Sequence, residues 1–211
     1  MVRRRQRMPL LRRRERTTLD DRLPWFGDEA VEWLHGYLKP AMNVFEWGTG
    51  GSTLFFAERA ASVVAVEHDP AWHAQVQSVL RRRRVRNAQL LLREPTPMPS
   101  VPEAYRSTEE RFVRHSFQSY AEAIDVYGDE FFDLVSVDGR ARPGCMKHAV
   151  RHVRPGGCLL LHDSERAEYD AGKAYLAAWP ARVMRGNGLH NPCPTETTIW
   201  QRPSRSHDDR H

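Results

Sequence analysis

A chain of 211 residues can bury one complete hydrophobic core, and 40% apolar residues with six tryptophans suit a soluble globular protein. No apolar run approaches the roughly 18 residues that a membrane span requires, and no secretory signal follows the N-terminal arginines. Three cysteines without metal-type spacing argue against a disulfide framework and a zinc knuckle. We therefore expect a cytoplasmic protein with one main domain.

The positive charge is concentrated at the N-terminus. The net charge is +5, but residues 1–16 carry eight arginines and one glutamate, so the rest of the chain has a charge of −2. We expect residues 1–22 to form a basic, disordered arm, residues 23–202 the folded domain and residues 203–211 a disordered tail. The alternative is an arm that binds nucleic acid, because clustered arginines neutralise phosphates.

Helix and strand patterns alternate along the chain. Helical spacing of apolar residues and short apolar runs between turn residues predict, in order, helix 28–38, strand 42–47, helix 52–60, strand 62–69, helix 70–84, strand 88–92, helix 119–127, strand 131–137, helix 145–153, strand 158–162, helix 174–179 and strands 181–185 and 195–201. This alternation predicts a doubly wound, mostly parallel sheet with helices on both faces.

Residues 93–115 interrupt the alternation. The segment has four prolines and no clear period, and it is too long for an ordinary connector. Two interpretations remain open, a substrate lid and a disordered insertion.

The loop after the first strand, "FEWGTGGST", contains an acid and three glycines. No lysine follows as a phosphate-binding loop requires, and Thr53 stands where a dinucleotide loop has its third glycine. Glu46, two residues before Gly48, suits an ammonium or amino-acid ligand better than a pyrophosphate. Glu67 ends the second strand, where a carboxylate can accept hydrogen bonds from both hydroxyls of a ribose.

Four phrases in order, "FEWGTGGSTLFFA", "VVAVEHDPAW", "DLVSVDGRAR" and "GGCLLLHDSER", resemble the class I S-adenosylmethionine (SAM)-dependent methyltransferases. The similarity runs from about Pro24 to Gln201 and includes a group of small bacterial methyltransferases. It implies a three-layer Rossmann-like fold with a seven-stranded sheet whose last strand is antiparallel. Ser52 replaces the third glycine of the family's loop.

The resemblance also implies the cofactor and its contacts. The glycine loop would pass under the methionine part of SAM, with Glu46 near the ammonium group through a network or water, and Glu67 would hold the ribose. Arg93 and Glu94 would flank the adenine. The residues that we expect to bind SAM are Glu46, Gly48, Thr49, Gly50, Gly51, Ser52, Glu67, His68 and Asp138.

Three polar residues follow the fourth and fifth strands, beside the expected cofactor crevice. Asp138, His162 and Asp163 are therefore the candidate catalytic residues. In one version Asp138 and Asp163 hold Mg²⁺, as in the similar catechol-type O-methyltransferases, although Ser164 replaces the usual asparagine. In the other, which we favour, His162 is the general base. His115 and Tyr120 are further candidates for contact with the acceptor.

We expect methylation, mainly on oxygen, of a small-molecule or sugar acceptor. A nucleic-acid methyltransferase that uses the arginine-rich arm is the first alternative. Against it, "VDGRAR" stands where amino-methylating nucleic-acid enzymes carry an Asn/Asp-Pro-Pro-aromatic motif. A SAM-binding protein without catalysis is the second alternative.

Overall fold

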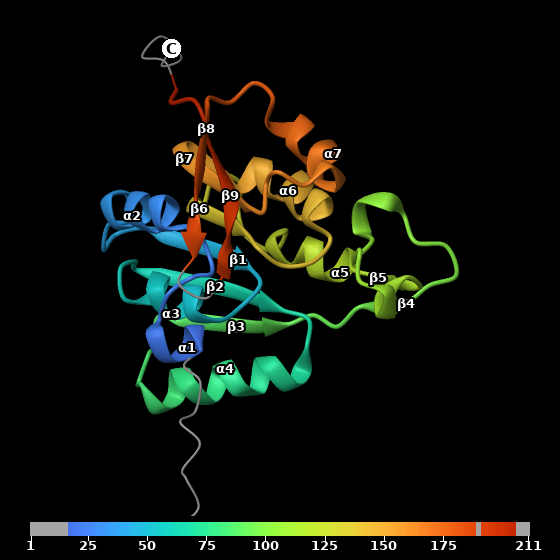
Figure 1. The fold of residues 1–211 in the computed structure, drawn as a ribbon, viewed down its shortest axis with the longest axis horizontal. Helices are drawn as coiled ribbons and strands as arrows, with labels where there is room; N and C mark the ends of the chain where they lie inside the picture. The colour runs from blue at the N-terminus through green and yellow to red at the C-terminus, as the bar shows by residue number, and fades with distance from the viewer. Residues whose placement is uncertain (1–16, 189–190, 206–211) are drawn as a thin grey trace, which may run out of the picture.

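The computed structural model describes residues 17–188 and 191–205, and its centre is a seven-stranded sheet in the order β3-β2-β1-β6-β7-β9-β8 (Figure 1). In this sheet β9 runs antiparallel to both of its neighbours, β7 and β8, and the other pairs of strands are parallel. The expected doubly wound sheet with an antiparallel last strand is thus confirmed. The strands are β1 (Asn43–Trp47), β2 (Ser62–Glu67), β3 (Ala88–Leu92), β6 (Phe132–Val137), β7 (Val153–His162), β8 (Ala181–Gly188) and β9 (Asn191–Gln201).

Helices cover both faces of the sheet. The α-helices are α1 (Thr18–Asp21), α2 (Asp28–Tyr37), α3 (Gly51–Ala57), α4 (Pro70–Arg82), α5 (Gln118–Ala121), α6 (Arg142–His152) and α7 (Asp170–Lys173). Short 3-10 helices are η1 (Glu103–Tyr105), η2 (Glu110–Phe112), η3 (Glu122–Ile124), η4 (Ala167–Tyr169) and η5 (Ala174–Leu176). None of the helices in the described ranges has the length and apolar character needed to cross a bilayer.

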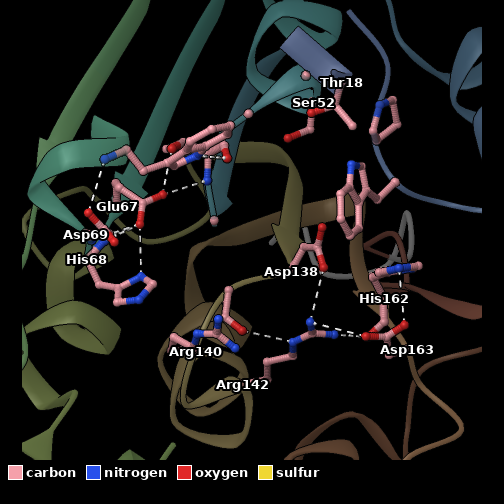
Figure 2. Close-up of a pocket in the computed structure, with 18 of the residues that line it drawn as sticks. Thr18, Ser52, Glu67, His68, Asp69, Asp138, Arg140, Arg142, His162 and Asp163 are labelled. Atoms are coloured by element: carbon pink, nitrogen blue, oxygen red, sulfur yellow. Dashed lines mark hydrogen bonds and ion pairs between the residues drawn. The ribbon is translucent and has the colours of Figure 1, made fainter. Parts of the chain in front are cut away.

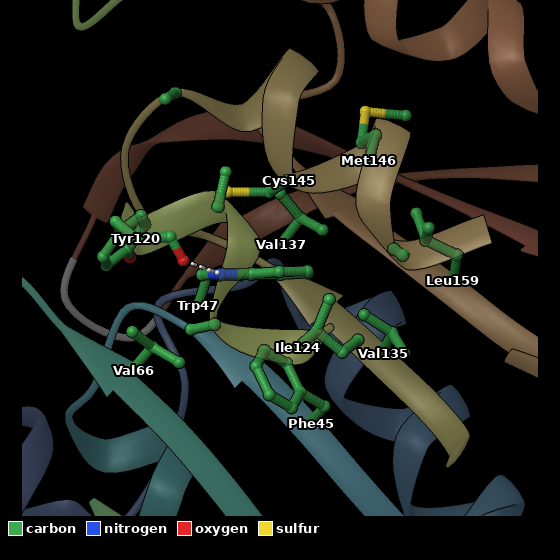
Figure 3. Packing of buried hydrophobic residues seen from close by; sticks show 14 of the residues in the cluster. Phe45, Trp47, Val66, Tyr120, Ile124, Val135, Val137, Cys145, Met146 and Leu159 are labelled. Atoms are coloured by element: carbon green, nitrogen blue, oxygen red, sulfur yellow. Dashed lines mark hydrogen bonds between the residues drawn. The ribbon is translucent and has the colours of Figure 1, made fainter. Parts of the chain in front are cut away.

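The central strands are buried on both faces. Along β1, Val44 belongs to the cluster formed with α2 and α3, whereas Phe45 and Trp47 belong to the cluster formed with α5 and α6. This alternation follows the two-residue repeat of a strand. In Figure 3 the Trp47 ring lies in the second cluster, and its Nε1 donates a 2.8 Å hydrogen bond to the carbonyl oxygen of Tyr120. The end of β1 is therefore fixed against α5.

The insertion at 93–115 is folded. Two short strands, β4 (Thr96–Pro97) and β5 (His115–Ser116), pair antiparallel, and the insertion projects beyond the sheet in Figure 1. Val101 and Tyr105 are buried, and the Tyr105 hydroxyl lies 3.0 Å from His148 Nε2 of α6. The expectation of a disordered insertion is therefore wrong, because apolar side chains anchor the segment to the domain.

The folded domain begins earlier than residue 23. Leu19 of α1 is buried in a cluster with Leu54 and Val76, and the hydroxyl and backbone N–H of Thr17 both donate to Asp20. Residues 17–22 are thus not part of an arm, because one apolar side chain and a capping pair hold this turn on the domain. Residues 1–16 and 206–211, the rest of the expected arm and tail, lie outside the described residues.

Some element boundaries also differ from the expected ones. β7 begins at Val153 instead of residue 158, because Gly156 and Gly157 continue to pair with Arg202 beyond β9. α6 begins at Arg142 instead of residue 145, with Pro143 in its first turn, where a missing N–H costs nothing. The expected helix at 119–127 is the short α5 followed by η3.

The packing of α1 on α3 generates a test of the fold. A methyl group at Gly51 would lie 2.1 Å from the carbonyl oxygen of Leu23, whereas one at Gly36 in α2 would meet nothing within 4 Å. Gly51→Ala should lower the free energy of unfolding in urea by roughly 1–3 kcal/mol or more, since backbone must shift. Gly36→Ala should raise it by up to about 1 kcal/mol. Equal effects would contradict this packing.

Candidate functional site

A cavity of about 810 Å³ opens at the carboxyl ends of the central strands, where ligands bind in doubly wound sheets. Its walls come from four places: the glycine loop after β1, the residues after β2, the loop after β6 and the end of β7. Residues 23–25 and two residues at the start of α1 close another side. The volume lies in the upper part of the usual range for small-molecule sites.

The glycine loop approaches β6 very closely. Gly48 has φ +90°, and a methyl group there would lie 2.9 Å from the carbonyl oxygen of Asp138. Only glycine adopts this conformation without strain and leaves room for the neighbouring strand end. Gly48, Thr49, Gly50, Gly51 and Ser52 all line the cavity, as we expect for cofactor-binding residues.

Glu67 is held as a carboxylate at the end of β2. Its Oε2 accepts a 2.7 Å hydrogen bond from the Thr49 hydroxyl, and its Oε1 accepts hydrogen bonds from the backbone N–H groups of His68 and Asp69. The ring Nδ1 of His68 lies 2.9 Å from the same Oε1. Burial alone would raise the pKa of Glu67, but these hydrogen bonds outweigh it and lower the pKa to about 2.

Glu46 has the opposite environment. It is buried, its Oε2 accepts a 2.7 Å hydrogen bond from the Ser52 hydroxyl, and its Oε1 has no partner among the described residues. Burial raises the pKa of Glu46 to about 8, despite the hydrogen bond from Ser52. Glu46 does not itself line the cavity as the described residues form it, whereas its partner Ser52 does.

Two further residues lie beside the glycine loop and Glu67, the part of the cavity that we call the cofactor half. Their place there was not evident from the sequence. The Trp72 indole Nε1 donates a 2.8 Å hydrogen bond to the carbonyl oxygen of Thr49, so α4 holds the glycine loop from the side. Thr18 of α1 lines the cavity above Gly50. The only signal for Trp72 was its place two residues after Pro70, at the start of the second helix.

An arginine joins the two candidate catalytic acids. The Arg142 guanidinium Nη2 lies 3.2 Å from Asp138 Oδ1 and 3.5 Å from Asp163 Oδ2, as the dashed lines in Figure 2 show. Arg142 also donates to the carbonyl oxygens of Gly139 and His162. The sequence signal for this arginine was its position in "VDGRAR", four residues after Asp138.

His162 lies beside these acids, with both ring nitrogens occupied. Nδ1 is 3.1 Å from the Thr197 hydroxyl, and Nε2 is 3.3 Å from Asp163 Oδ1. The ring packs on Phe26 with 4.9 Å between ring centroids, and the side chain is only 5% exposed. A neutral imidazole has one N–H and one lone pair, and in these contacts both form hydrogen bonds with protein groups.

The two aspartates do not fit a magnesium ion. Arg142 already stands between them as a cation, and Asp163 is also paired with Arg166 at 2.8 Å. Ser164 faces away, with hydrogen bonds to Glu196 and Thr198. Among the residues that the structure describes, no group of three or more His, Cys, Asp or Glu side chains is arranged to hold a metal.

Four residues predicted from the sequence do not reach the site. In the described structure, Arg93, Glu94, His115 and Tyr120 do not line the cavity. Tyr120 is fully buried in the core beneath Gly139, because its ring packs edge-on against Phe117 with 5.8 Å between ring centroids. His115 is part of β5 and contacts the Phe112 ring edge-on, with 5.9 Å between ring centroids. The expected acceptor contact of Tyr120 is therefore wrong, whereas the assignments of Arg93, Glu94 and His115 stay predictions.

Comparison with known proteins identifies the fold. No protein-family model and no curated protein matches the chain, but solved structures do. An rRNA methylase from Streptococcus thermophilus is 14% identical, with a TM-score of 0.56 over 82% of this chain and 93% of that one. A methyltransferase from Streptococcus mutans in complex with SAH is 16% identical, with a TM-score of 0.55 over 81% and 94%. The precorrin-6y C5,15-methyltransferase from Geobacter metallireducens is 14% identical, with a TM-score of 0.56 over 78% and 82%.

The chain has the methyltransferase fold. Its seven-stranded sheet with one antiparallel strand agrees with these structures over about four fifths of the chain. The cavity lies at the switch point of the sheet, beside β1. From β1 the chain first builds the half with β2 and β3, and then the half that begins with β6.

The buried acid Glu46 makes stability depend on pH. Its pKa rises from 4.5 when unfolded to about 8 when folded, so its contribution is complete below pH 4.5 and is lost as the pH rises to about 8. Replacing it with Gln should remove a slope of up to about 1.4 kcal/mol per pH unit from the free energy of unfolding. Urea unfolding across this pH range measures the slope. The control Glu58→Gln, at a surface pair with Arg22, should keep it.

Proposed function

We propose that this protein is a SAM-dependent methyltransferase that transfers a methyl group to an oxygen of a small-molecule acceptor or sugar. The observation that carries the proposal is the pairing of Glu67 with the glycine loop through Thr49, at the switch point of a methyltransferase fold. A carboxylate whose pKa is about 2 stays ionised and can accept hydrogen bonds from ribose hydroxyls.

The glycine loop and the two glutamates would bind different parts of SAM. Gly48 to Ser52 would support the methionine part, and Glu67 with His68 would face the ribose. Glu46 has a buried oxygen without a partner among the described residues and would attract an ammonium group through Ser52. SAM, when bound, supplies an activated methyl group and carries its own leaving group, so the protein has to supply alignment and a proton acceptor.

Asp138 fits the role of proton acceptor better than His162. Its Oδ1 is bound by Arg142, its side chain is 25% exposed, and it lines the cavity. Both ring nitrogens of His162 already contact protein groups, Nδ1 the Thr197 hydroxyl and Nε2 the Asp163 carboxylate. We infer that Asp138 accepts the proton of the acceptor hydroxyl, while Arg142 fixes its orientation and His162 closes the cavity wall behind it.

A small acceptor suits the cavity. Its walls come from four separate parts of the sheet and from residues near α1, which favours an enclosed molecule over a nucleic-acid strand. One structural neighbour is an rRNA methylase, so methylation of a nucleic acid stays the second candidate function. The basic residues that would serve it, 1–16, lie outside the described residues. A cytoplasmic location and the absence of a membrane partner remain predictions.

Binding of SAM and its demethylated product is the first test of this function. Glu67→Gln should weaken SAM binding by about 1–3 kcal/mol, because the ribose would lose its ionised acceptor. Titration calorimetry with SAM and with its product measures the effect. The surface variant Glu58→Gln should bind as the wild type does. Binding of NAD, without either SAM species, would reject the assignment.

The second test separates the possible catalytic groups. Asp138→Asn should lower the rate of methyl transfer at saturating SAM by about 10²-fold or more, since a general base contributes about 10²–10⁴-fold, and SAM affinity is measured separately because Asp138 is also an expected SAM contact. His162→Gln should have a smaller effect, and EDTA should have none. Loss of activity in EDTA with recovery in Mg²⁺ would restore the metal version. A larger loss in the His162 variant would make the imidazole the base.

A further inference from the structure

The acceptor half of the cavity is rich in arginine. The arginines on this wall form ion pairs with a smaller number of carboxylates. Two of those carboxylates each pair with more than one arginine. The arginines are Arg111, Arg140, Arg142 and Arg166, and the carboxylates paired with them are Glu109, Asp138 and Asp163. Four guanidinium groups on this wall are therefore paired with three carboxylates, while Glu67 and Asp69 line the other wall of the same cavity.

One of these arginines is fully used by the protein. The side chain of Arg142 is only 8% exposed, and it contacts Asp138, Asp163 and two backbone carbonyl oxygens. Its ring neighbour Tyr169 lies 5.0 Å away in a cation–π contact. Arg142 is thus a fixed part of the site, and a ligand would meet the other arginines.

Arg140 and Arg166 have donors to spare. Arg166 pairs with Asp163 through one nitrogen at 2.8 Å, and its side chain is 47% exposed. Arg140 pairs with Glu109, which it shares with Arg111, and its side chain is 33% exposed. A guanidinium has five N–H donors, so each of these pairs leaves several available at the cavity. Such a fork matches the oxygens of a carboxylate or phosphate.

We propose that the acceptor carries an anionic oxygen group, a carboxylate or a phosphate, and that Arg166 and Arg140 supply the N–H donors that bind it. The inference rests on the proposed function, because it names the substrate class of the same cavity. The remaining guanidinium N–H donors of Arg140 and Arg166 are the complement of such a group. The two arginines follow the ends of β6 and β7, the same strand ends that carry Asp138 and Asp163.

The cavity also offers an apolar surface for the rest of the acceptor. Trp25 lines it, and this residue is 54% exposed, which is high for a large apolar residue. The next residue, Phe26, packs on His162, so the segment runs past the acceptor end of the cavity. A planar ring that carries a hydroxyl and an anionic group would match Trp25 together with the arginines.

Binding of three matched probes tests the proposal. The probes are 4-hydroxybenzoate, 4-hydroxyphenyl phosphate and the neutral 4-hydroxybenzamide, titrated into the full chain with and without the demethylated product of SAM. At least one anionic probe should bind about tenfold more tightly than the amide, and the preferred anion distinguishes carboxylate from phosphate. Arg166→Gln and Arg140→Gln should each reduce that binding by about tenfold. NMR titration measures all three constants.

The matched control is Arg182→Gln. Arg182 has a similar exposed pairing, with Glu29, away from this cavity, and its loss should leave binding unchanged. Equal binding of the amide and both anions, or anion binding that survives both arginine substitutions, would overturn the proposal. So would an RNA oligonucleotide that binds in an Arg166-dependent manner while both small anions fail. Failure to bind SAM or its product would instead reject the proposed function. The titrations without product would still test whether Arg140 and Arg166 bind the anions.

Discussion

The carboxyl end of β1 is held between its two neighbours by two backbone hydrogen bonds. Gly48 donates to the carbonyl oxygen of Val66 in β2, and Asp138 after β6 donates to that of Trp47, each at 3.0 Å. This junction needs a residue without a side chain at 48, since a methyl group would strike Asp138. It sets the spacing between Glu67 on one side and Asp138 on the other. The cofactor half and the acceptor half of the site are both built from it.

Three acids in this site are controlled by three different surroundings. Hydrogen bonds keep Glu67 ionised, burial without enough donors keeps Glu46 protonated near neutral pH, and a shared arginine fixes Asp138. One glutamate is thus ionised and able to accept hydrogen bonds from hydroxyl groups, while the other holds its proton up to about pH 8. Environment, and not residue type, assigns these roles.

The sequence was sufficient for the fold and for the position of the glycine loop beside the cavity, because both depend on local patterns. Strand periodicity, glycines and strand-end acids such as Glu67 are visible along the chain. The role of Arg142 was not visible, because it depends on the meeting of two strand ends that are 25 residues apart in the sequence, at Asp138 and Asp163. Tyr120 was misassigned for a related reason: whether an aromatic side chain faces a cavity or the core is decided by tertiary packing.

The guanidinium of Arg142 changes what the site can do with an acceptor. It stands between the two aspartates where the metal version of the mechanism needs Mg²⁺. A metal lowers the pKa of a hydroxyl that it binds directly, whereas the contacts of Arg142 among the described residues are two carboxylates, two carbonyl oxygens and the Tyr169 ring. A carboxylate such as Asp138 can accept a proton from a phenol-like hydroxyl, with a pKa near that of tyrosine at about 10, far more readily than from a sugar hydroxyl. Within the proposed function, this wall therefore favours acceptors whose hydroxyl is already acidic, with alignment supplying the rest of the rate.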